Sequence, residues 1–446
     1  MPGVPRRDIA AWLRRTAVPI EAVDAGRRTG DLAALRSMLD GVRVVGLGEV
    51  THGTKEFYQY KNRLLRHLVS ELGFTIVAIE GSYSSAQVVD DYVVNAVGDR
   101  SAVLAEFGHH AMWDVEEFGA ALDWLRAHNQ SVPDSAKVRF HGLNMWHTRV
   151  GRACVLAYLR RVAPRRLPAV RRLFDAVAWG EGRGMLPAHQ RLDGESFQSV
   201  RELADFLSSD RERLIAMTSP AEYDDVVRQV AIIRQWIACN LSTALPPGEF
   251  AAPVPPVQGL NIFARSTYIG RNLIDVMERA EPGAKALIWA HSLHVGVGFV
   301  DEVHGQTPNM GSYLRARLGD AYYAIAMETE RGTYLTREFL PDQTLGDHRI
   351  GVIPPAPAGT LAWYLAAAES ERFLLDLRRF APDQAAARWL AEPRVMHCAG
   401  WGLSDPPLTT TMRLGEAYDG LIFMRETAAT TPTGNALKAV SQRAVH

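Results

Sequence analysis

Cysteine is scarce in this chain, and neither sign of charge is in excess. Three of the 446 residues are cysteines: Cys154, Cys239 and Cys398. An odd number of cysteines at wide spacing argues against a disulfide framework and against a Cys-x-x-Cys metal site. We therefore expect reduced thiols and a cytoplasmic protein.

The balance of charge and the lack of long apolar runs exclude two further classes of function. The 49 basic and 50 acidic side chains give a formal net charge of -1, which creates no field to attract nucleic acid or an anionic membrane. The charged, amphipathic N-terminal segment lacks the apolar core of a signal peptide, and no stretch approaches the length of a membrane span. We expect a small-molecule substrate, with no nucleic-acid or membrane partner, and the sequence leaves the oligomeric state open.

The chain does contain a glycine-rich turn between an apolar run and an amphipathic segment. The run Val44-Val45-Gly46-Leu47 predicts a buried strand, because it is short and rich in β-branched residues. Apolar residues recur every three or four positions from Phe57 to Leu72, which predicts a helix over residues 54–71, capped by Thr54 and ended by Gly73. Glu49 and His52 therefore lie between a strand and a helix, where open α/β sheets bind their ligands.

Three interpretations of this turn compete. A nucleotide-binding fingerprint fits poorly, since Thr51 occupies the third glycine position and Glu49 would oppose a pyrophosphate. A turn whose polar groups only cap local backbone would be the usual explanation for a lone Glu-x-x-His. An acid/base site is the third interpretation, and the rest of the chain favours it.

The same pattern, an apolar strand that stops at a polar residue, recurs along the chain. Four more strands are predicted, over residues 75–79, 138–143, 285–290 and 322–327. Polar residues follow each of them in turn: Glu80, then Asn144 and His147, then His291 and His294, then Glu328. If the strands are parallel, these groups share one edge of the sheet. The sequence thus predicts an α/β fold with a central, mostly parallel sheet flanked by helices.

Residues 150–245 carry helical periodicity without a strand signal, and a proline-rich linker from Leu245 to Pro256 follows. We predict a helical insertion, residues 150–257, that forms a cap beside the active-site cleft of a discontinuous α/β catalytic domain, residues 1–149 and 258–446. Near the N-terminus, Asp31 is the expected cap of a short helix. Two further strands are expected at 394–398 and 420–424.

Histidines and carboxylates at one edge suit proton transfer and water activation. His52 is the best general base, with Glu49 or Glu80 fixing its tautomer, and His291 is expected to donate to a developing oxyanion. A serine nucleophile is disfavoured, because the chain has no Gly-x-Ser-x-Gly elbow around its strand-end serines.

A metal site is the main alternative. His52, His291 and His294 with one glutamate could bind zinc or manganese and leave an open position for water. The histidines come from two separate loops, however, and no cysteine ligand lies near them. We therefore expect neither a catalytic metal nor another cofactor.

The turn also resembles a known signature. Gly46-Leu47-Gly48-Glu49-Val50-Thr51-His52-Gly53-Thr54-Lys55-Glu56-Phe57 is similar to the signature of the erythromycin esterase family. The resemblance covers most of residues 30–335, through Gly73-Phe74, Ile79-Glu80, 113–129, 261–272, 288–294 and Met310-Gly311. It implies a metal-independent hydrolase that opens a macrolide lactone with water activated by His52, without a covalent intermediate. Glu49, Glu80 and His291 match the family's other active-site positions.

Nine further residues are expected to contact the substrate: Lys61, Arg63, His110, Trp113, Asn144, His147, Arg265, His294 and Glu328. Trp113 is equally compatible with a place in the core. Two residues depart from the family pattern, Asp114 where arginine is usual and Ser266 where aspartate is usual, and both are expected to line the substrate cleft. The same site could instead make or rearrange an ester or lactone in biosynthesis, or belong to a protein that only binds its ligand.

Overall fold

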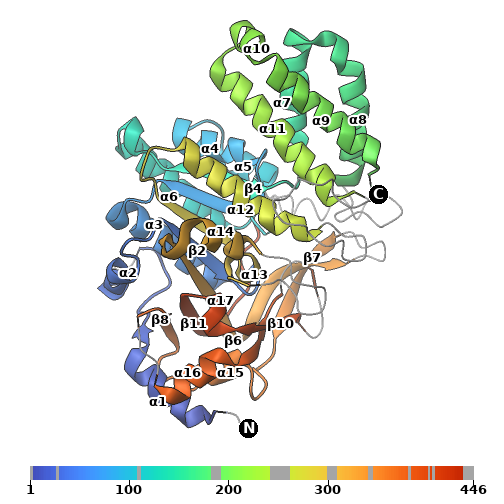
Figure 1. Ribbon diagram of the computed structural model, residues 1–446. Helices are drawn as coiled ribbons and strands as arrows, with labels where there is room; N and C mark the ends of the chain where they lie inside the picture. The colour runs from blue at the N-terminus through green and yellow to red at the C-terminus, as the bar shows by residue number, and fades with distance from the viewer. Residues whose placement is uncertain are drawn as a thin grey trace.

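The computed structural model describes residues 4–26, 30–107, 112–181, 192–241, 262–298, 309–339, 345–379, 383–399, 402–403 and 407–434. The candidate substrate residue His110 lies outside these ranges, and so does the expected linker at 245–256. Figure 1 shows a central sheet with helices around it and a bundle of helices at one end.

Within the described residues the central sheet has nine strands in the order β1-β8-β11-β6-β2-β5-β3-β4, with β7 paired to β6. The strand bounds are β1 Val18–Pro19, β2 Val44–Glu49, β3 Ile76–Ser82, β4 Arg139–Asn144, β5 Ala286–His291, β6 Tyr322–Phe339, β7 Leu345–Ile353, β8 Arg372–Asp376 and β11 Gly420–Thr427. Strands β4, β3, β5, β2, β6 and β11 pair in parallel, whereas β1, β7 and β8 pair antiparallel. The predicted α/β fold with a mostly parallel sheet is confirmed.

The sheet places the Glu49 strand at its centre. Strand β2 lies between β5 and β6, and Glu49 is in register with His291 at the end of β5. All six residues of β2 are buried, as continuous apolar runs in a parallel sheet require. Both faces of this strand are therefore covered by helices, and only its carboxyl end can open to a ligand.

One predicted strand end was wrong. Strand β6 continues eleven residues past Glu328, and its second half forms an antiparallel pair with β7. Residues Thr333-Tyr334-Leu335-Thr336 explain the extension, because β-branched and aromatic residues suit a strand. Glu328 lies in the middle of β6.

The strand expected at 394–398 is β9, Pro393–His397, which pairs with β10, Thr409–Arg413, in a separate small sheet.

Helices cover both faces of the sheet (Figure 1). Their bounds are α1 Arg6–Thr16, α2 Ala33–Met38, α3 Lys55–Leu72, α4 Ala86–Asn95, α5 Arg100–Phe107, α6 Glu116–Ser131, α12 Ile262–Arg279, α13 Ser292–Val295, α14 Met310–Leu318, α15 Leu361–Leu365, α16 Gln384–Ala391 and α17 Leu414–Ala417. A Cβ on Gly48 would lie 2.7 Å from Ser292 Cα of α13, whereas Glu49 contacts Lys61 of α3. Since adjacent strand residues point to opposite faces, α3 and α13 lie on opposite faces of β2.

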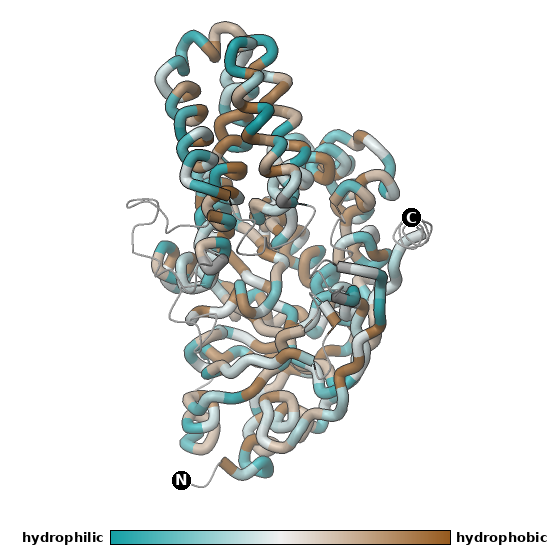
Figure 2. The backbone as a smooth tube through the Cα atoms, turned by 90° about the vertical axis from the view of Figure 1, so that its right-hand side faces the viewer, coloured by the Kyte–Doolittle hydropathy of each residue, from teal (hydrophilic) through white to brown (hydrophobic). Residues whose placement is uncertain are grey.

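A separate bundle of helices follows β4 (Figures 1 and 2). It comprises α7 Arg149–Val162, α8 Leu167–Glu181, α9 Gly194–Ser209, α10 Arg211–Met217 and α11 Pro220–Cys239. Buried polar contacts join α11 to the rest of the chain, with Ser84 Oγ donating to Gln229 Oε1 at 2.7 Å. The helices stand where the sequence predicted them, and the proposed domain boundaries stay a prediction.

Two glycines control the ends of helix α3, and one expected cap is wrong. The Thr54 hydroxyl bonds to Thr51 Oγ1 at 2.5 Å and caps no helix N–H. Gly73, at φ 71°, ends the helix in the left-handed region as predicted. Gly53, at φ 73°, packs its Cα against the Leu335 backbone and accepts hydrogen bonds from Leu335 N and Thr430 N.

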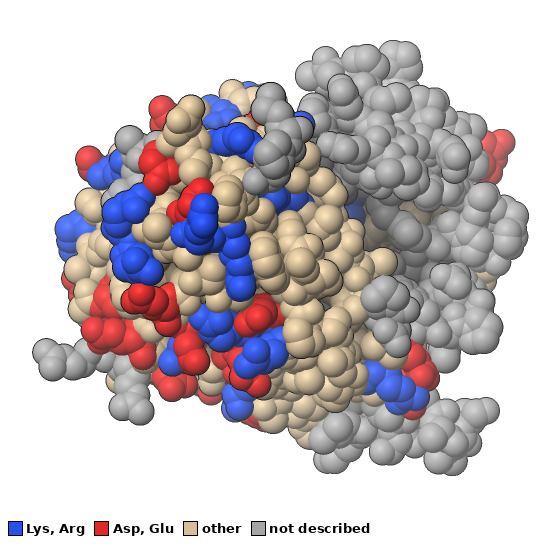
Figure 3. All heavy atoms as spheres, turned by 90° about the horizontal axis from the view of Figure 1, so that it is seen from below, with Lys and Arg blue, Asp and Glu red and all other residues tan. Residues whose placement is uncertain are grey.

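The described surface and thiols agree with the composition. On the face seen from below in Figure 3, basic and acidic side chains are interspersed. Cys154, Cys239 and Cys398 are free thiols. None of the described helices has the length and apolarity that crossing a membrane requires.

Replacing Gly53 by alanine should destabilise the fold more than the same change elsewhere. A Cβ at Gly53 would lie 2.1 Å from Leu335 O, and the residue has positive φ. Gly73 has positive φ without a neighbour within 4 Å, and Gly194 has neither constraint. We expect losses in free energy of unfolding of roughly 2–5 kcal/mol for Gly53→Ala, about 1 kcal/mol for Gly73→Ala and about zero for Gly194→Ala. Urea denaturation of the three variants measures this order, and equal losses at all three positions would contradict it.

Candidate active site

His52 is held by the carboxylate at the end of the central strand. Its Nδ1 lies 2.9 Å from Glu49 Oε1, and the His52 residue is 5% exposed. Because a carboxylate only accepts, Nδ1 carries the ring proton and Nε2 keeps its lone pair. The turn after β2 therefore presents an imidazole in the tautomer that a general base requires.

Glu49 has a second partner on helix α3. Lys61 forms an ion pair with Glu49 Oε2 and donates to Ala290 O at 3.2 Å, and its side chain is fully buried. Burial lowers the pKa of Lys61 well below its usual value, against the charge of Glu80. Lys61 thus occupies the second oxygen of Glu49. The predicted contact of Lys61 with substrate is wrong, because this side chain has no exposed surface.

Arg63 is also not a substrate residue. Its guanidinium bonds to both oxygens of Asp31, at 2.7 and 2.5 Å, and to Ala22 O at 2.8 Å. Two residues along a helix are rotated by about 200°, so Arg63 and Lys61 point in opposite directions. The same contact corrects the role of Asp31, which binds Arg63 instead of capping a helix; α2 begins after Leu32.

Glu80, two residues before the end of β3, connects three elements. Its Oε1 accepts from Arg265 Nη2 at 2.6 Å and lies 3.0 Å from His294 Nε2, while Oε2 accepts from the His291 backbone N–H at 2.9 Å. Burial opposes ionisation, but the neighbouring His294 and Arg265 hold the pKa of this carboxyl well below its usual value. Glu80 is thus a fixed negative charge beside two histidines.

His291 packs against the His52 ring. Their ring centroids are 5.0 Å apart. His291 Nδ1 accepts from Leu293 N at 3.2 Å, and the ring also hydrogen-bonds the Val50 backbone. Burial and the nearby His52 lower the pKa of His291 well below its usual value. Both sides of this ring are engaged, so the expected donation from His291 to an oxyanion finds no support in the geometry.

Burial dominates the basicity of His52. It lowers the pKa of His52 to about 4, with the charge of Glu80 opposing and those of His294 and Arg265 adding to the shift. His52 is therefore neutral, and able to accept a proton, throughout the physiological range.

Ser266, a departure from the family pattern, contacts the same cluster. Its Oγ lies 2.6 Å from His294 Nδ1, and His294 Nε2 lies 3.1 Å from Arg265 Nη1 as well as near Glu80. Arg265 in turn lies over the Trp146 ring at 5.9 Å. The structure therefore brings Ser266 of α12, His294 of α13 and Glu80 of β3 together.

Asn144 and His147 lie where β4 ends. Asn144 is 3% exposed and its Oδ1 accepts from Trp146 N at 3.3 Å. His147 adopts φ 59°, and its backbone oxygen accepts from Ser82 Oγ at 3.0 Å. Their roles in substrate binding stay predictions.

Two residues expected near the substrate belong to packing contacts instead. Trp113 is 2% exposed and lies in an aromatic cluster, with ring centroids 5.8 Å from Tyr58 and 5.2 Å from Phe118. Asp114 binds the Thr433 hydroxyl and accepts from Thr433 N at 3.1 Å through its backbone oxygen. Burial raises the pKa of Asp114. The segment that carries both residues therefore pairs with the chain near Pro432 and Thr433, and a role of either side chain in the substrate cleft stays a prediction.

A second carboxylate–histidine pair escaped the sequence reasoning. Glu328 is fully buried, and its Oε1 lies 2.7 Å from His397 Nδ1 while Oε2 accepts from His397 N at 3.1 Å. Burial lowers the pKa of His397, but the Glu328 carboxylate has the opposite and larger combined effect, so the pKa is raised above its usual value. Glu328 is therefore occupied by the protein itself, against the expectation that it binds substrate. His397 ends β9, and the strand-end pattern used above could have identified it.

The segment after β9 supports the His52 turn. Ala399 N donates to Val50 O at 2.8 Å, and His52 N donates to Ala399 O at 3.2 Å. The backbone of the His52 turn is thus extended by a short parallel partner from the C-terminal part of the chain.

The described residues hold no preformed set of ligands for the alternative metal site. Among the described residues no group of three histidine, cysteine or acidic side chains is arranged to hold an ion. His294 shows why, since Nδ1 contacts Ser266 and Nε2 contacts Glu80 and Arg265. His52 and His291 likewise each have Nδ1 in a protein hydrogen bond.

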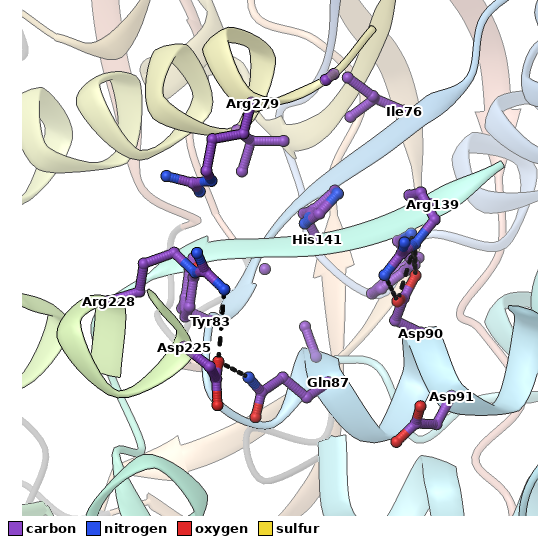
Figure 4. Close-up of a pocket in the computed structure, with 15 residues that line it drawn as sticks. Ile76, Tyr83, Gln87, Asp90, Asp91, Arg139, His141, Asp225, Arg228 and Arg279 are labelled. Atoms are coloured by element: carbon purple, nitrogen blue, oxygen red, sulfur yellow. Dashed lines mark hydrogen bonds and ion pairs between the residues drawn. The ribbon is translucent and has the colours of Figure 1, made fainter. Parts of the chain in front are cut away.

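A cavity of about 600 Å³ lies elsewhere, beside the edge strand β4 and between α4, α11 and α12 (Figure 4). Its charged side chains are largely paired with one another: Asp90 binds Arg139 at 2.6 Å, and Asp225 accepts from Gln87 at 2.7 Å. None of its lining residues belongs to the His52 cluster. We assign no chemistry to it.

Comparison with known proteins identifies the family. A family model described as erythromycin esterase matches residues 69–427. The chain belongs to the erythromycin esterase family. The matched range begins after the Glu49–His52 turn. The match therefore supports a hydrolase of this family and leaves the roles of the turn residues open.

Similar proteins match nearly the whole length of the chain. YbfO of Bacillus subtilis (strain 168), provisionally named a hydrolase, is 21% identical over 438 residues, covering 93% of this chain and 90% of its own. A Bacillus cereus protein of solved structure has a TM-score of 0.77 at 21% identity, covering 96% of this chain and 99% of its own. A mutant of the erythromycin esterase EreC, in its open conformation, has a TM-score of 0.67 at 18% identity, covering 93% and 97%.

Removing Lys61 should destabilise this erythromycin esterase family member far more than removing an exposed partner. Lys61→Met leaves Glu49 buried with one oxygen unpaired, which we expect to cost about 3–5 kcal/mol of unfolding free energy. Arg14→Met breaks the exposed pair with Glu369, whose side chains are 62% and 74% exposed, and should cost less than about 1 kcal/mol. Denaturation of both variants and of the double variant Glu49→Gln/Lys61→Met measures the difference. A double variant no more stable than Lys61→Met would contradict the pairing.

Proposed function

We propose that this protein hydrolyses an ester or lactone of a macrolide or related natural product, with His52 as the general base that activates water. The observation that carries the proposal is the His52–Glu49 contact, in which Nδ1 is fixed by the carboxylate and Nε2 is left to accept a proton. Membership in the erythromycin esterase family supports the reaction class.

The cluster supplies charge for each stage of this reaction. A water that gives its proton to His52 Nε2 becomes the nucleophile, and Glu49 stabilises the imidazolium that results. Arg265, whose side chain is 19% exposed and bound to Glu80, is the group we assign to the developing oxyanion. The proposed reaction uses no metal and no other cofactor.

The proposal includes a division of the chain into a catalytic domain and a cap. We propose that residues 150–257 act as a cap domain and that residues 1–149 with 258–446 form the catalytic domain. The bundle α7–α11 stands at one end of the molecule, and its helix α11 contacts α12, which carries Arg265 and Ser266 (Figure 1).

Replacing His52 by glutamine should abolish hydrolysis while substrate still binds. A general base contributes about 10²- to 10⁴-fold in rate, so kcat should fall by that factor. Mass spectrometry of macrolides and simpler lactones, incubated with the protein in ¹⁸O-labelled water, follows the reaction. A gain of one labelled water supports hydrolysis, whereas tight binding without a change in mass supports a binding protein.

His141→Gln is a control, because this second histidine is half-buried and lines the separate cavity beside β4, away from the His52 cluster. Its activity should equal that of the wild type. Unchanged turnover in folded His52→Gln protein would rule out His52 as the base.

The acid limb of activity should lie well below the usual histidine range. Burial lowers the pKa of His52 to about 4, so the base form persists as pH falls and is lost only near pH 4. The unfolded chain takes up this proton near pH 6.5, so stability declines between about pH 6.5 and pH 4. We therefore expect kcat/KM to fall with an apparent pKa of about 4, measured on protein shown to be folded by circular dichroism. A limb near pH 6.5 in folded protein would contradict this assignment.

A further inference from the structure

The cavity beside β4 lies where three parts of the structure meet. It has a volume of about 600 Å³ and is lined by residues of α4, β4, α11 and α12 (Figure 4). Helix α11 belongs to the bundle, and α12 also carries Arg265 of the His52 cluster. Sites for small organic molecules typically have volumes of roughly 300–1,000 Å³. The proposed hydrolysis uses none of the lining residues, so a role of this cavity lies in binding.

The charges at one end of the cavity satisfy each other. Asp90 Oδ2 accepts from Arg139 Nε at 3.1 Å and from Arg139 Nη2 at 2.6 Å, and Asp90 Oδ1 accepts from Phe140 N at 2.8 Å. Figure 4 shows this pair apart from Arg228 and Arg279, which line the other end. The Asp90 end therefore has no charge left for a ligand.

The two guanidiniums at the other end have weaker partners. Arg228 lies 3.9 Å from Asp225, and the same Asp225 oxygen accepts from Gln87 at 2.7 Å. Arg279 pairs with Asp275, whose side chain is 54% exposed and does not line the cavity. An exposed ion pair of this kind contributes little energy. Both guanidiniums are therefore able to bind a further anion.

Tyr83 and His141 add two polar side chains that have no partner. Within the part of the chain that the structure describes, the Tyr83 hydroxyl and the His141 ring make no hydrogen bond. Burial raises the pKa of Tyr83; Arg228 and Arg279 oppose this rise, each more strongly than either neighbouring carboxylate adds to it. The Tyr83 hydroxyl therefore lies in a positive field, which favours a negatively charged ligand.

We propose that this cavity binds a small organic anion, whose carboxylate or phosphate group is held by Arg228 and Arg279. A guanidinium matches the geometry of either group, since it donates two parallel hydrogen bonds. The Tyr83 hydroxyl donates to the same group. Burial lowers the pKa of His141 to about 4, so its ring is neutral and offers one further N–H. The organic part of the ligand contacts the apolar lining, which comprises Ile76, Ala86, Phe140, Val276 and Ala280.

Such a ligand contacts the sheet edge, the bundle and α12 at the same time. Because it binds the folded state alone, it stabilises the bundle against the sheet by mass action. The inference goes beyond the proposed hydrolysis and does not depend on it, since binding is measured without an ester.

The test uses benzylphosphonate and phenylacetate as probes, with benzyl alcohol as the neutral molecule that shares their aromatic ring. Saturation-transfer-difference NMR of the full chain measures Kd for each. We expect a Kd of roughly 1 mM for the anions, as is usual for fragments of this size. Benzyl alcohol should bind at least about 10-fold more weakly, because it forms no charge-assisted hydrogen bond.

Three variants test the site itself. Arg228→Gln and Arg279→Gln should each raise the Kd of the bound anion by at least about 10-fold, because a hydrogen bond to a charged group is lost. Ala280→Phe fills the apolar part of the cavity without changing its charge and should also prevent binding. Circular dichroism verifies that each variant is folded, and ester hydrolysis by the two arginine variants should equal that of the wild type.

Two further arginines serve as controls. Arg213→Gln removes a guanidinium of the same bundle that bonds to Asp210 at 2.6 Å and does not line the cavity. Arg265→Gln removes the guanidinium of the His52 cluster, where an anion would compete for a different site. Both variants should bind the probes with the Kd of the wild type.

The outcomes identify the ligand class or reject the site. Binding of both anions supports a general site for organic anions, whereas binding of only benzylphosphonate or only phenylacetate assigns the charged group. Absence of binding by both anions at about 10 mM, equal binding of benzyl alcohol, or an unchanged Kd in both folded arginine variants would overturn the proposal. Loss of binding in Arg265→Gln alone would place the anion in the His52 cluster and likewise reject this cavity.

Discussion

The site depends on one buried carboxylate that has two partners. Glu49 ends the central strand at 0% exposure, and a carboxylate at that depth must have both oxygens satisfied. Lys61 on α3 and His52 on the following turn meet this requirement. The constraint fixes the register of α3 against β2, because only one side of that helix can present Lys61. It also fixes the tautomer of His52, so packing and chemistry have the same cause.

Glu80 of β3 plays a comparable part, on the side of β5 that lies away from β2. It binds the backbone of one histidine, His291, and the side chain of another, His294, with Arg265 offsetting its charge. Two carboxylates thus hold three histidines in different protonation environments within one sheet edge. Because burial is the largest effect on the pKa values of His52 and His291, small changes in the packing around these rings change their basicity.

Much of the fold could be predicted from the sequence, because buried parallel strands are continuous apolar runs. Strands β2 to β5 stood out for that reason, and glycine at 73 marked a helix end. What was missed required long-range pairing: β7 and β8 are antiparallel partners that no local pattern specifies, and β6 continues past Glu328 along β11 and then along β7.

The candidate site was predictable to the level of strand ends and no further. The rule that polar groups follow parallel strands placed Glu49, Glu80 and His291 at one edge, while their catalytic roles stay predictions. Helical geometry could have shown that Lys61 and Arg63 cannot face the same side. The contact of Ser266 with His294 could not be predicted, because three separate elements create it and no spacing in the sequence records it.

The support of the His52 turn by Ala399 has a consequence for the order in which the chain acquires activity during translation. The turn is synthesised early, but its backbone partners at Ala399 and Thr430 are made at least 347 residues later. At about 5–20 residues per second, the ribosome needs roughly 20–70 s to reach them. The nascent protein therefore carries His52 and Glu49 for most of synthesis without the backbone partners that orient the turn between them.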